Sequence, residues 1–266
     1  MERRHLTILT GASRGLGRAM AEQLLAPERL LLTMERRPDT ALAPLAAQRG
    51  AHLEQWSQDL SEPAEAAERL TRWLLTLQPA TLASATLINN AALLPTIGPL
   101  QAGSGEELSR ALRVGLEAPM HLTAAFLRVS DRWVQAHGWD GPRRVLNISS
   151  GLGRYPMAGQ AIYCAVKAGL DHFSRCTALD EARRPHGARI VSLAPGVIDT
   201  DMQVQMRAGD PAGFPDRARF LRLHAQGQLT PAREAAQRVL AWLARPDFGD
   251  PCVADVRDAT QTIPGG

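Results

Sequence analysis

HLTILTGASRGLG, residues 5–17, places an apolar run directly before three closely spaced glycines. The apolar run predicts a buried β-strand, and residues 18–26 have the composition of a helix. Gly11 allows a tight turn between the two, while Gly15 and Gly17 let the backbone and the helix approach closely. The N–H groups and the positive dipole at the start of a helix attract a phosphate group. The stretch therefore predicts a strand–turn–helix unit that binds a nucleotide.

The glycine spacing differs from two other phosphate-binding motifs. It is not G-x-G-x-x-G, and the turn does not end in the Gly-Lys-Ser/Thr of the phosphate loop, which argues against an ATPase. A glycine turn without any ligand is the alternative interpretation. The place of the turn, between the first expected strand and the first expected helix, favours nucleotide binding.

Beyond this unit, short apolar runs alternate with longer segments rich in Ala, Leu, Glu and Arg. The expected strands are 5–10, 30–34, 52–56, 85–90, 143–149 and 188–194, and the further expected helices are 62–77, 105–129, 160–182 and 231–244. This alternation predicts an α/β fold with a doubly wound parallel sheet and helices on both faces. No repeat or linker interrupts it, so residues 1–266 are predicted to form a single domain.

Two regions break the alternation. Residues 129–144 look like a helix end and a loop with two tryptophans, and we expect them to lie at the periphery. Residues 195–220 are long and rich in Pro, Gly and Asp. A long loop after the carboxyl end of a strand is well placed to cover a ligand crevice. We therefore expect a substrate-covering loop at about 195–229.

The composition bounds the possible partners. The chain is 45% hydrophobic and 21% charged, with a formal net charge of +3, and no basic stripe interleaved with aromatics predicts a nucleic-acid surface. Cys164, Cys176 and Cys252 are odd in number and lack metal-ligand spacing. With no signal peptide, they indicate a reducing cytoplasm and no metal site. No apolar run approaches the roughly 18 residues of a membrane span.

Tyr163 and Lys167 form a pair with chemical meaning. Lys167 is the only lysine among 30 basic residues, and Tyr163 is one of two tyrosines. Four residues apart in a predicted helix, they share one face. An ammonium close to a phenol is expected to lower the phenol's pKa. The ammonium is a compact point charge, whereas a guanidinium is flat, which is a reason for lysine rather than arginine at this position. Ser150, at the end of a predicted strand, can hold a substrate carbonyl while Tyr163 donates a proton. An ordinary Tyr–Lys pair on a helix surface is the alternative.

Taken together, these motifs resemble the short-chain dehydrogenase/reductase family over almost the full length. The motifs are TGASRGLG at 10–17, QDL with Asp59, NNAA at 89–92, NISS with Ser150, YCAVK at 163–167 and PGVIDT at 195–200. The resemblance implies a Rossmann-type fold, a nicotinamide cofactor, Ser150, Tyr163 and Lys167 as catalytic residues, and a homodimer or homotetramer. Lys167 would also bind the nicotinamide ribose.

The resemblance also implies a cofactor site. The expected cofactor-binding residues are Gly11, Ser13, Arg14, Gly15, Leu16, Gly17, Arg36, Asp59, Leu60, Asn90, Ala91, Tyr163, Lys167, Pro195, Gly196, Val197 and Thr200. Arg14 and Arg36 can reach a 2′-phosphate, which favours NADP(H). Glu35 can instead hold free ribose hydroxyls, so NAD(H) is the alternative.

The second half resembles a narrower group, the sepiapterin reductases and the bacterial reductases of benzil-type diketones. The similar stretches are YCAVKAGLD, APGVIDTDMQ and FGDPCVADVRD. This predicts an NADPH-dependent carbonyl reductase that transfers a hydride to a ketone or vicinal diketone, with Ser150 and Tyr163 touching the substrate. It also predicts that Asp255 binds the substrate, although Asp255 is alternatively the partner of Arg257. Other candidate substrates are a ketoacyl thioester or a sugar.

Gly115 departs from the family pattern. The family usually has an asparagine here, which holds a water that passes protons to the lysine, and this chain reads RVGLEAP. The departure puts the proton relay in doubt, and it is the feature that favours a catalytically weak NADP-binding sensor over an enzyme. We expect Gly115→Asn to be tolerated structurally, since asparagine is a somewhat better helix residue than glycine.

Overall fold

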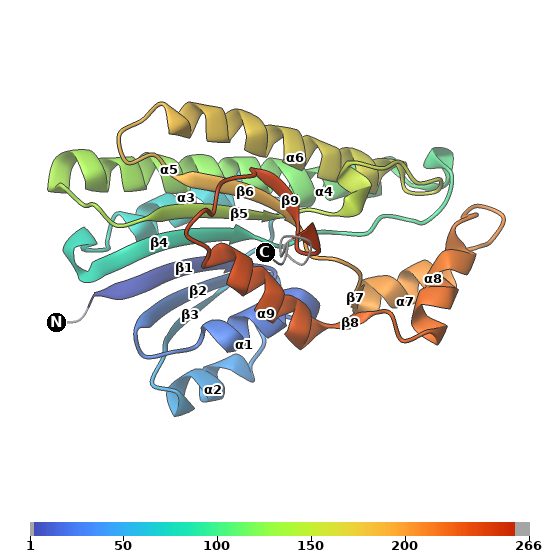
Figure 1. Ribbon diagram of the computed structural model, residues 1–266, viewed down its shortest axis with the longest axis horizontal. Coiled ribbons are helices and arrows are strands. Elements are labelled where there is room, and N and C mark those ends of the chain that lie inside the picture. Colours follow the sequence, from blue (N-terminus) through green and yellow to red (C-terminus); the bar gives the residue numbers. More distant parts are fainter. Residues whose placement is uncertain (1–2, 259–266) are drawn as a thin grey trace, which may run out of the picture.

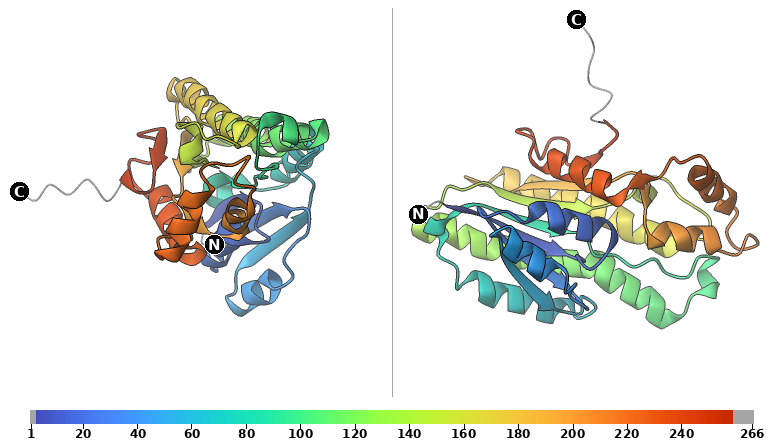
Figure 2. Two further views of the ribbon diagram at one scale, coloured as in Figure 1. Left: turned by 90° about the vertical axis from the view of Figure 1, so that its right-hand side faces the viewer. Right: turned by 90° about the horizontal axis from the view of Figure 1, so that it is seen from below.

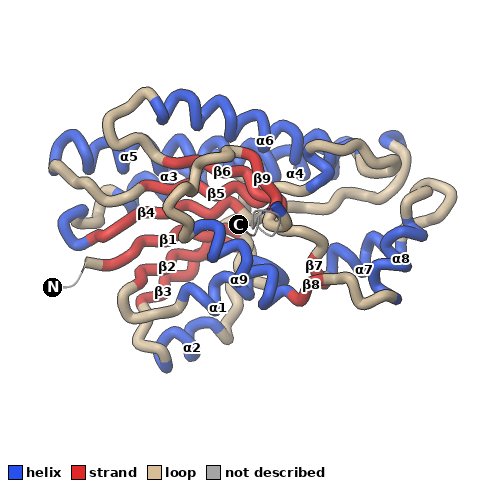
Figure 3. Tube along the Cα trace, in the orientation of Figure 1, coloured by secondary structure: helices blue, strands red, loops and turns tan. Residues whose placement is uncertain are grey.

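The central sheet is parallel throughout and is doubly wound. The computed structural model describes residues 3–258, and within them seven strands follow the order β3-β2-β1-β4-β5-β6-β9 (Figures 1 and 3). The chain order reverses between β1 and β4, which opens a crevice at the carboxyl ends of these strands. The strands are β1 (Arg4–Thr10), β2 (Arg29–Glu35), β3 (His52–Ser57), β4 (Leu82–Asn89), β5 (Arg143–Ile148), β6 (Arg189–Ala194) and β9 (Val253–Asp255). The predicted α/β fold is confirmed.

Helices cover both faces of this sheet (Figure 1). One face carries α1 (Gly15–Leu24), α2 (Leu42–Gln48) and α9 (Ala232–Leu243). The other carries α3 (Pro63–Leu74), α4 (Gly105–Leu112), the π-helical turn η3 (Arg113–Glu117), α5 (Ala118–His137) and α6 (Ala161–Ala182). Short 3₁₀ turns lie at η1 (Pro79–Thr81), η2 (Leu100–Ala102) and η4 (Gly151–Gly153).

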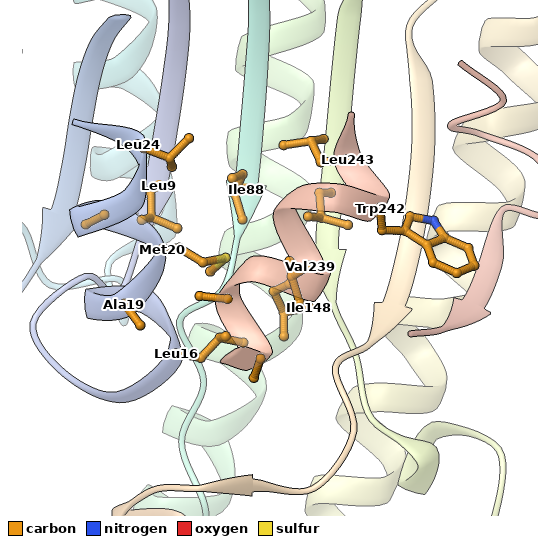
Figure 4. Close-up of a cluster of buried hydrophobic side chains, with 14 of the residues drawn as sticks. Leu9, Leu16, Ala19, Met20, Leu24, Ile88, Ile148, Val239, Trp242 and Leu243 are labelled. Atoms are coloured by element: carbon orange, nitrogen blue, oxygen red, sulfur yellow. The ribbon is translucent and has the colours of Figure 1, made fainter. Parts of the chain in front are cut away.

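Alternate residues of β1 enter different cores, which is why the strand is apolar almost without a break. Leu6 and Ile8 pack beneath α3 and α5, and Leu9 packs beneath α1 and α9. All three side chains are fully buried. Figure 4 shows Leu9 beside Met20 of α1, with Val239 and Trp242 of α9 closing the same layer. Each such buried side chain contributes about 1.5–3 kcal/mol.

The segment with two tryptophans is part of the core, so the prediction that it is peripheral was wrong. Trp133 and Trp139 are 3% and 4% exposed, and their rings pack edge to face with centroids 5.5 Å apart. Trp139 Nε1 donates a hydrogen bond of 2.8 Å to the carbonyl of Leu82. A tryptophan can be buried where its N–H finds an acceptor. Here the acceptor lies on a strand distant in sequence.

The region predicted as a covering loop contains regular structure. It holds β7 (Ile198–Asp199), α7 (Asp201–Ala208), α8 (Arg217–Ala225) and β8 (Thr230–Pro231), and it projects beyond the carboxyl ends of the strands (Figure 2). Met206, Phe214 and Phe220 form a small core of its own. Leu94, Ile97, Leu152 and Met157 pack against that core. We call residues 198–231 the lid segment.

Candidate active site

A crevice of about 1730 Å³ lies where the sheet order reverses, between the strand ends and the lid segment. It exceeds the roughly 300–1,000 Å³ of an ordinary small-ligand pocket. The structure brings every predicted site residue to its walls: Gly11, Ser13, Arg14, Gly15, Leu16, Gly17, Arg36, Asp59, Leu60, Asn90, Ala91, Ser150, Tyr163, Lys167, Pro195, Gly196, Val197, Thr200 and Asp255. Their individual roles stay predictions.

The glycine turn is held by the segment after β4. Gly11 and Gly15 have φ angles of +73° and +56°, the left-handed region that glycine occupies readily. Asn90 Nδ2 donates hydrogen bonds of 3.0 and 3.1 Å to the carbonyls of Thr10 and Gly11. A Cβ on Gly17 would lie 2.0 Å from the Gly11 carbonyl oxygen. The turn is therefore a cradle that any larger side chain at Gly17 would fill.

The N-terminus of α1 suits a phosphate group. It has no side-chain cap and no acidic residue in its first turn, so none of its own side chains competes for its N–H groups or its dipole. These features fit a dinucleotide. The residues present therefore agree with the nicotinamide cofactor that the motifs imply.

The groups at the end of β2 bear on the choice between the two cofactors. Glu35 is 4% exposed, accepts a hydrogen bond of 2.9 Å from Thr33 Oγ1, and has a pKa that burial raises. Arg36 is exposed at the crevice wall. Arg14 forms an ion pair of 2.8 Å with Asp201, the first residue of α7. Both arginines thus lie at the crevice, with Arg14 already paired to Asp201. Glu35 also lines the crevice, but it is almost fully buried.

Tyr163 is a buried phenol. Burial raises the pKa of Tyr163 to about 12, and its hydrogen bond with Ser150 offsets this only in part. Lys167 is not among the groups that shift this pKa, so the expectation that Lys167 lowers it was wrong. The Lys167 ammonium donates its hydrogen bond of 2.7 Å to the carbonyl of Ile148, and Nζ lies 5.6 Å from the Tyr163 ring centroid. Tyr163 is therefore protonated at neutral pH, as a proton donor must be.

Gly115 is packed against a side chain, so the expectation that Gly115→Asn is tolerated was wrong. A Cβ on Gly115 would lie 2.5 Å from Val166 Cγ1. Val166 is buried on α6, next to Lys167, and its branched side chain has few alternative rotamers. The space of an asparagine is thus occupied by valine. The sequence held the signal, since Val166 is the bulky third residue between Tyr163 and Lys167.

Gly115→Asn is expected to lower the free energy of unfolding by about 1–3 kcal/mol, the usual cost of overpacking a core. Adding Val166→Ala in the same chain should recover most of that loss, because it removes the methyl groups in the way. Urea unfolding of the two single variants and the double variant measures this coupling. A Gly115→Asn variant as stable as the wild type would contradict the packing argument.

Asp255 lies in the crevice wall, but its carboxylate is already bound. Arg257 Nε and Nη2 donate to its two oxygens at 2.8 and 2.6 Å. Burial opposes ionisation of Asp255, and the hydrogen bonds from Arg257 outweigh burial and lower its pKa. A substrate would have to share this carboxylate with Arg257.

Other residues of the crevice wall escaped the sequence analysis. They belong to the turn after β5 and to the lid segment, and they are Leu152, Arg154, Met157, Met206, Phe220 and Leu223. They share no motif, and only the expectation of a substrate-covering loop at about 195–229 indicated the region of the last three. Within the lid segment, Met206, Phe220 and Leu223 form an apolar part of the wall that we call the apolar roof, and polar lid residues such as Asp199, Gln203 and Arg219 line the crevice beside it.

Within residues 3–258, no group of three or more His, Cys, Asp and Glu side chains could hold a metal ion. Within the same range, no helix combines the length and the apolarity needed to cross a membrane.

An NAD(P)-dependent oxidoreductase is the class of protein that this fold and this site define. A family model described as short chain dehydrogenase matches residues 5–211. The chain therefore belongs to the short-chain dehydrogenase family.

Relatives with named activities match most of the chain. A benzil reductase ((S)-benzoin forming) from Bacillus cereus is 32% identical over 241 residues, covering 91% of this chain and 94% of that protein. A sepiapterin reductase from Meriones unguiculatus is 32% identical over 265 residues, covering 94% and 95%. Among solved structures, a short-chain dehydrogenase/reductase from Burkholderia vietnamiensis is 31% identical, with a TM-score of 0.63 and coverage of 97% and 99%.

Proposed function

We propose that this protein is an NADPH-dependent carbonyl reductase that acts on a ketone, in particular on one carbonyl of a vicinal diketone. The observation that carries the proposal is the buried, protonated Tyr163, hydrogen-bonded to Ser150 at the wall of a crevice large enough for a dinucleotide and a substrate. Similarity to benzil and sepiapterin reductases over more than nine-tenths of the chain supports the diketone.

In this proposal each residue has a distinct task. A bound nicotinamide supplies the hydride. The Ser150 hydroxyl orients the substrate carbonyl, and Tyr163 Oη donates the proton to its oxygen. Lys167 carries the positive charge beside them and binds the nicotinamide ribose. The apolar roof formed by the lid segment excludes water from the reacting carbonyl, which strengthens these electrostatic effects.

NADP(H) is the cofactor that the charges favour. A 2′-phosphate forms strong charge-assisted hydrogen bonds with guanidinium groups, and Arg14 and Arg36 are both exposed at the crevice. Glu35 is almost fully buried, which limits its access to ribose hydroxyls, although only one of its two oxygens is bonded to Thr33. NAD(H) is the alternative. A homodimer or homotetramer in the cytoplasm completes the proposal, and short-chain dehydrogenases are commonly oligomeric.

The test is the oxidation of NADPH and of NADH, followed by absorbance, with a panel of carbonyl compounds. We expect turnover with benzil and with a pterin diketone, and a higher kcat/KM with NADPH than with NADH. Turnover with only a ketoacyl thioester or only a sugar would show that the protein reduces that substrate and not a diketone. Cofactor binding without turnover on any compound would favour a sensor protein, and a preference for NADH would overturn the cofactor assignment.

Asp255→Asn is expected to raise KM for a pterin diketone by about tenfold and to leave KM for benzil unchanged. A carboxylate accepts hydrogen bonds from ring and amino N–H groups, each worth about 1.5–3 kcal/mol when a charge is involved. Benzil has no N–H to offer. Steady-state kinetics with both substrates measures the difference.

The control for Asp255→Asn is Arg257→Gln, which removes the competing donor from the same carboxylate. It should lower KM for the pterin diketone or leave it unchanged. Equal changes in KM for the two substrates would remove Asp255 from the substrate site.

A further inference from the structure

Asp171 is a buried carboxylate to which the proposed reaction assigns no task. It lies on α6 one helical turn after Lys167 and is 1% exposed. Its Oδ1 accepts a hydrogen bond of 2.6 Å from Ser192 Oγ on β6, and its Oδ2 lies 3.4 Å from Arg154 Nε. A buried charge is costly unless it is paired. The protein therefore maintains a charge beside the catalytic pair with two dedicated partners.

Asp171 also joins three parts of the active site. Arg154, which it binds, stands four residues after Ser150 and donates a hydrogen bond of 2.8 Å from Nη2 to the carbonyl of Ala254 on β9. Gly153 lets the turn approach α6, since a Cβ there would lie 2.8 Å from Asp171 Oδ2 and 2.9 Å from the Lys167 carbonyl oxygen. The carboxylate of Asp171 thus connects the turn after Ser150, the helix α6 that carries Lys167, and the strand β9 that carries Asp255.

Lys167 needs a counter-charge because its ammonium is buried. Burial lowers the pKa of Lys167 to about 8, and the charge of Asp171 opposes this by raising it. The other groups near the pair are Tyr163 on α6 itself and Arg154 from η4. From β9 comes Asp255, which Arg257 binds.

Among residues 3–258, the Cys252 thiol directly before β9 also faces Asp171; burial and the charge of Asp171 raise its pKa to about 11, so this thiol is neutral. The charged groups on the other elements packed against α6 are exposed or have partners of their own. On α4, Arg110 pairs with Asp59 at 3.6 Å. On η3, Arg113 and Glu117 are exposed. On β6, Arg189 binds the carbonyls of Pro246 and Phe248. Asp171, one helical turn from Lys167, is the group whose charge opposes the effect of burial on the pKa of the lysine.

The geometry points to Asp171 as a positioning residue: it is a buried anion one helical turn from the buried Lys167, for which it serves as counter-charge, and its bond to Arg154 holds the Ser150 segment against α6. This inference rests on the proposed function, because it assigns the charge of Lys167 a part in that reaction. It also extends to cofactor binding, in which Lys167 is expected to take part before any chemistry.

Asp171→Asn tests it, because asparagine keeps the shape and can still accept the hydrogen bond from Ser192. Without the anion, Lys167 loses its proton at a lower pH. The alkaline limb of kcat/KM should move down by about one pH unit, within the usual effect of a neighbouring charge. The affinity for NADPH, measured by fluorescence titration from about pH 6 to about pH 10, should decline over the same lowered range.

Glu181→Gln is the matched control. Glu181 is a second buried carboxylate on α6, 4% exposed, where it accepts a hydrogen bond of 2.8 Å from Ala188 N and lies 3.8 Å from Arg143. Its loss should lower stability without moving the alkaline limb. A uniform loss of kcat in Asp171→Asn, with the limb at the wild-type pH, would show a merely structural role and overturn the inference.

Arg154→Gln provides an independent arm should Asp171→Asn fail to fold. It removes a cation that faces Asp171, so the alkaline limb and the NADPH titration should move to higher pH. No movement of either would overturn the inference. If the wild type reduces no carbonyl compound, the proposed function fails, and the pH dependence of NADPH binding still decides the role of Asp171.

Discussion

Tyr163→Phe is expected to lower kcat by about 10²–10⁴-fold, the usual contribution of a positioned proton donor. The ring is 8% exposed and packs in place without its hydroxyl, so the site keeps its shape. The loss should appear equally in kcat and kcat/KM, because the proton transfer is made only in the transition state. Steady-state NADPH oxidation with the best carbonyl substrate measures it.

Two controls separate lost chemistry from lost structure. The dissociation constant for NADPH should stay close to that of the wild type, since Lys167 keeps its bond to the Ile148 carbonyl. Tyr155, the only other tyrosine, is 71% exposed at the rim of the same crevice. Tyr155→Phe should leave kcat within the same order of magnitude. A Tyr163→Phe variant that keeps most of its activity would show that another group donates the proton.

Gly17→Ala is expected to abolish cofactor binding and to lower the free energy of unfolding by about 3 kcal/mol, the upper end of the cost of overpacking. The added Cβ would meet the Gly11 carbonyl oxygen at 2.0 Å and Asn90 Nδ2 at 2.5 Å. Neither is a flexible chain end, because one is backbone and the other holds the glycine turn. Relief therefore requires α1 to move away from the phosphate cradle.

Gly105→Ala is the control, because it makes the same substitution at a position where the added Cβ has no close neighbour. Gly105 is exposed in the first turn of α4, and a Cβ there would meet nothing within 4 Å. This variant should be as stable as the wild type or up to about 1 kcal/mol more stable. Thermal unfolding with and without NADPH compares the two. A Gly17→Ala variant that NADPH still stabilises against thermal unfolding would show that cofactor binding does not depend on the close approach of Gly17 to the Gly11 carbonyl.

Most elements of the sheet and its covering helices could be predicted from periodicity, because a buried parallel strand and an amphipathic helix each leave a local pattern. Three segments differ from this expectation. The helix expected over 105–129 is two helices joined by the π-helical turn η3, and α5 continues to His137. The short helix α2, LAPLAAQ, was missed because seven residues with an internal proline hold too little pattern. The segment after β6 was expected to be irregular and contains α7 and α8.

The candidate site residues also divide into those that a local motif predicted and those that only the folded structure revealed. Residues within one motif could be recognised together, since Tyr163 and Lys167 share a helix face and the three glycines lie within seven residues, Gly11 in the turn and Gly15 and Gly17 at the start of α1. Arg154 and the apolar roof could not, because they reach the crevice from segments without a motif. The acid at Asp171 was invisible as well, since an aspartate in a helix is usually a solvated surface residue.

The sequence by itself determined what depends on local spacing. It specified the strand–turn–helix unit of the nucleotide site, the shared face of Tyr163 and Lys167, and the alternation that makes a parallel sheet. The first two relations follow from covalent geometry and the helical period within about ten residues, and the third is a repetition of such local patterns along the chain. Tertiary structure decided what depends on burial and on distant partners. It placed Val166 against Gly115, the Trp139 N–H against the Leu82 carbonyl, and Arg14 beside Asp201. It also raised the pKa of Tyr163 to about 12. A pKa and a steric fit are set by the atoms that surround a group, and these come from elements brought together only when the chain folds.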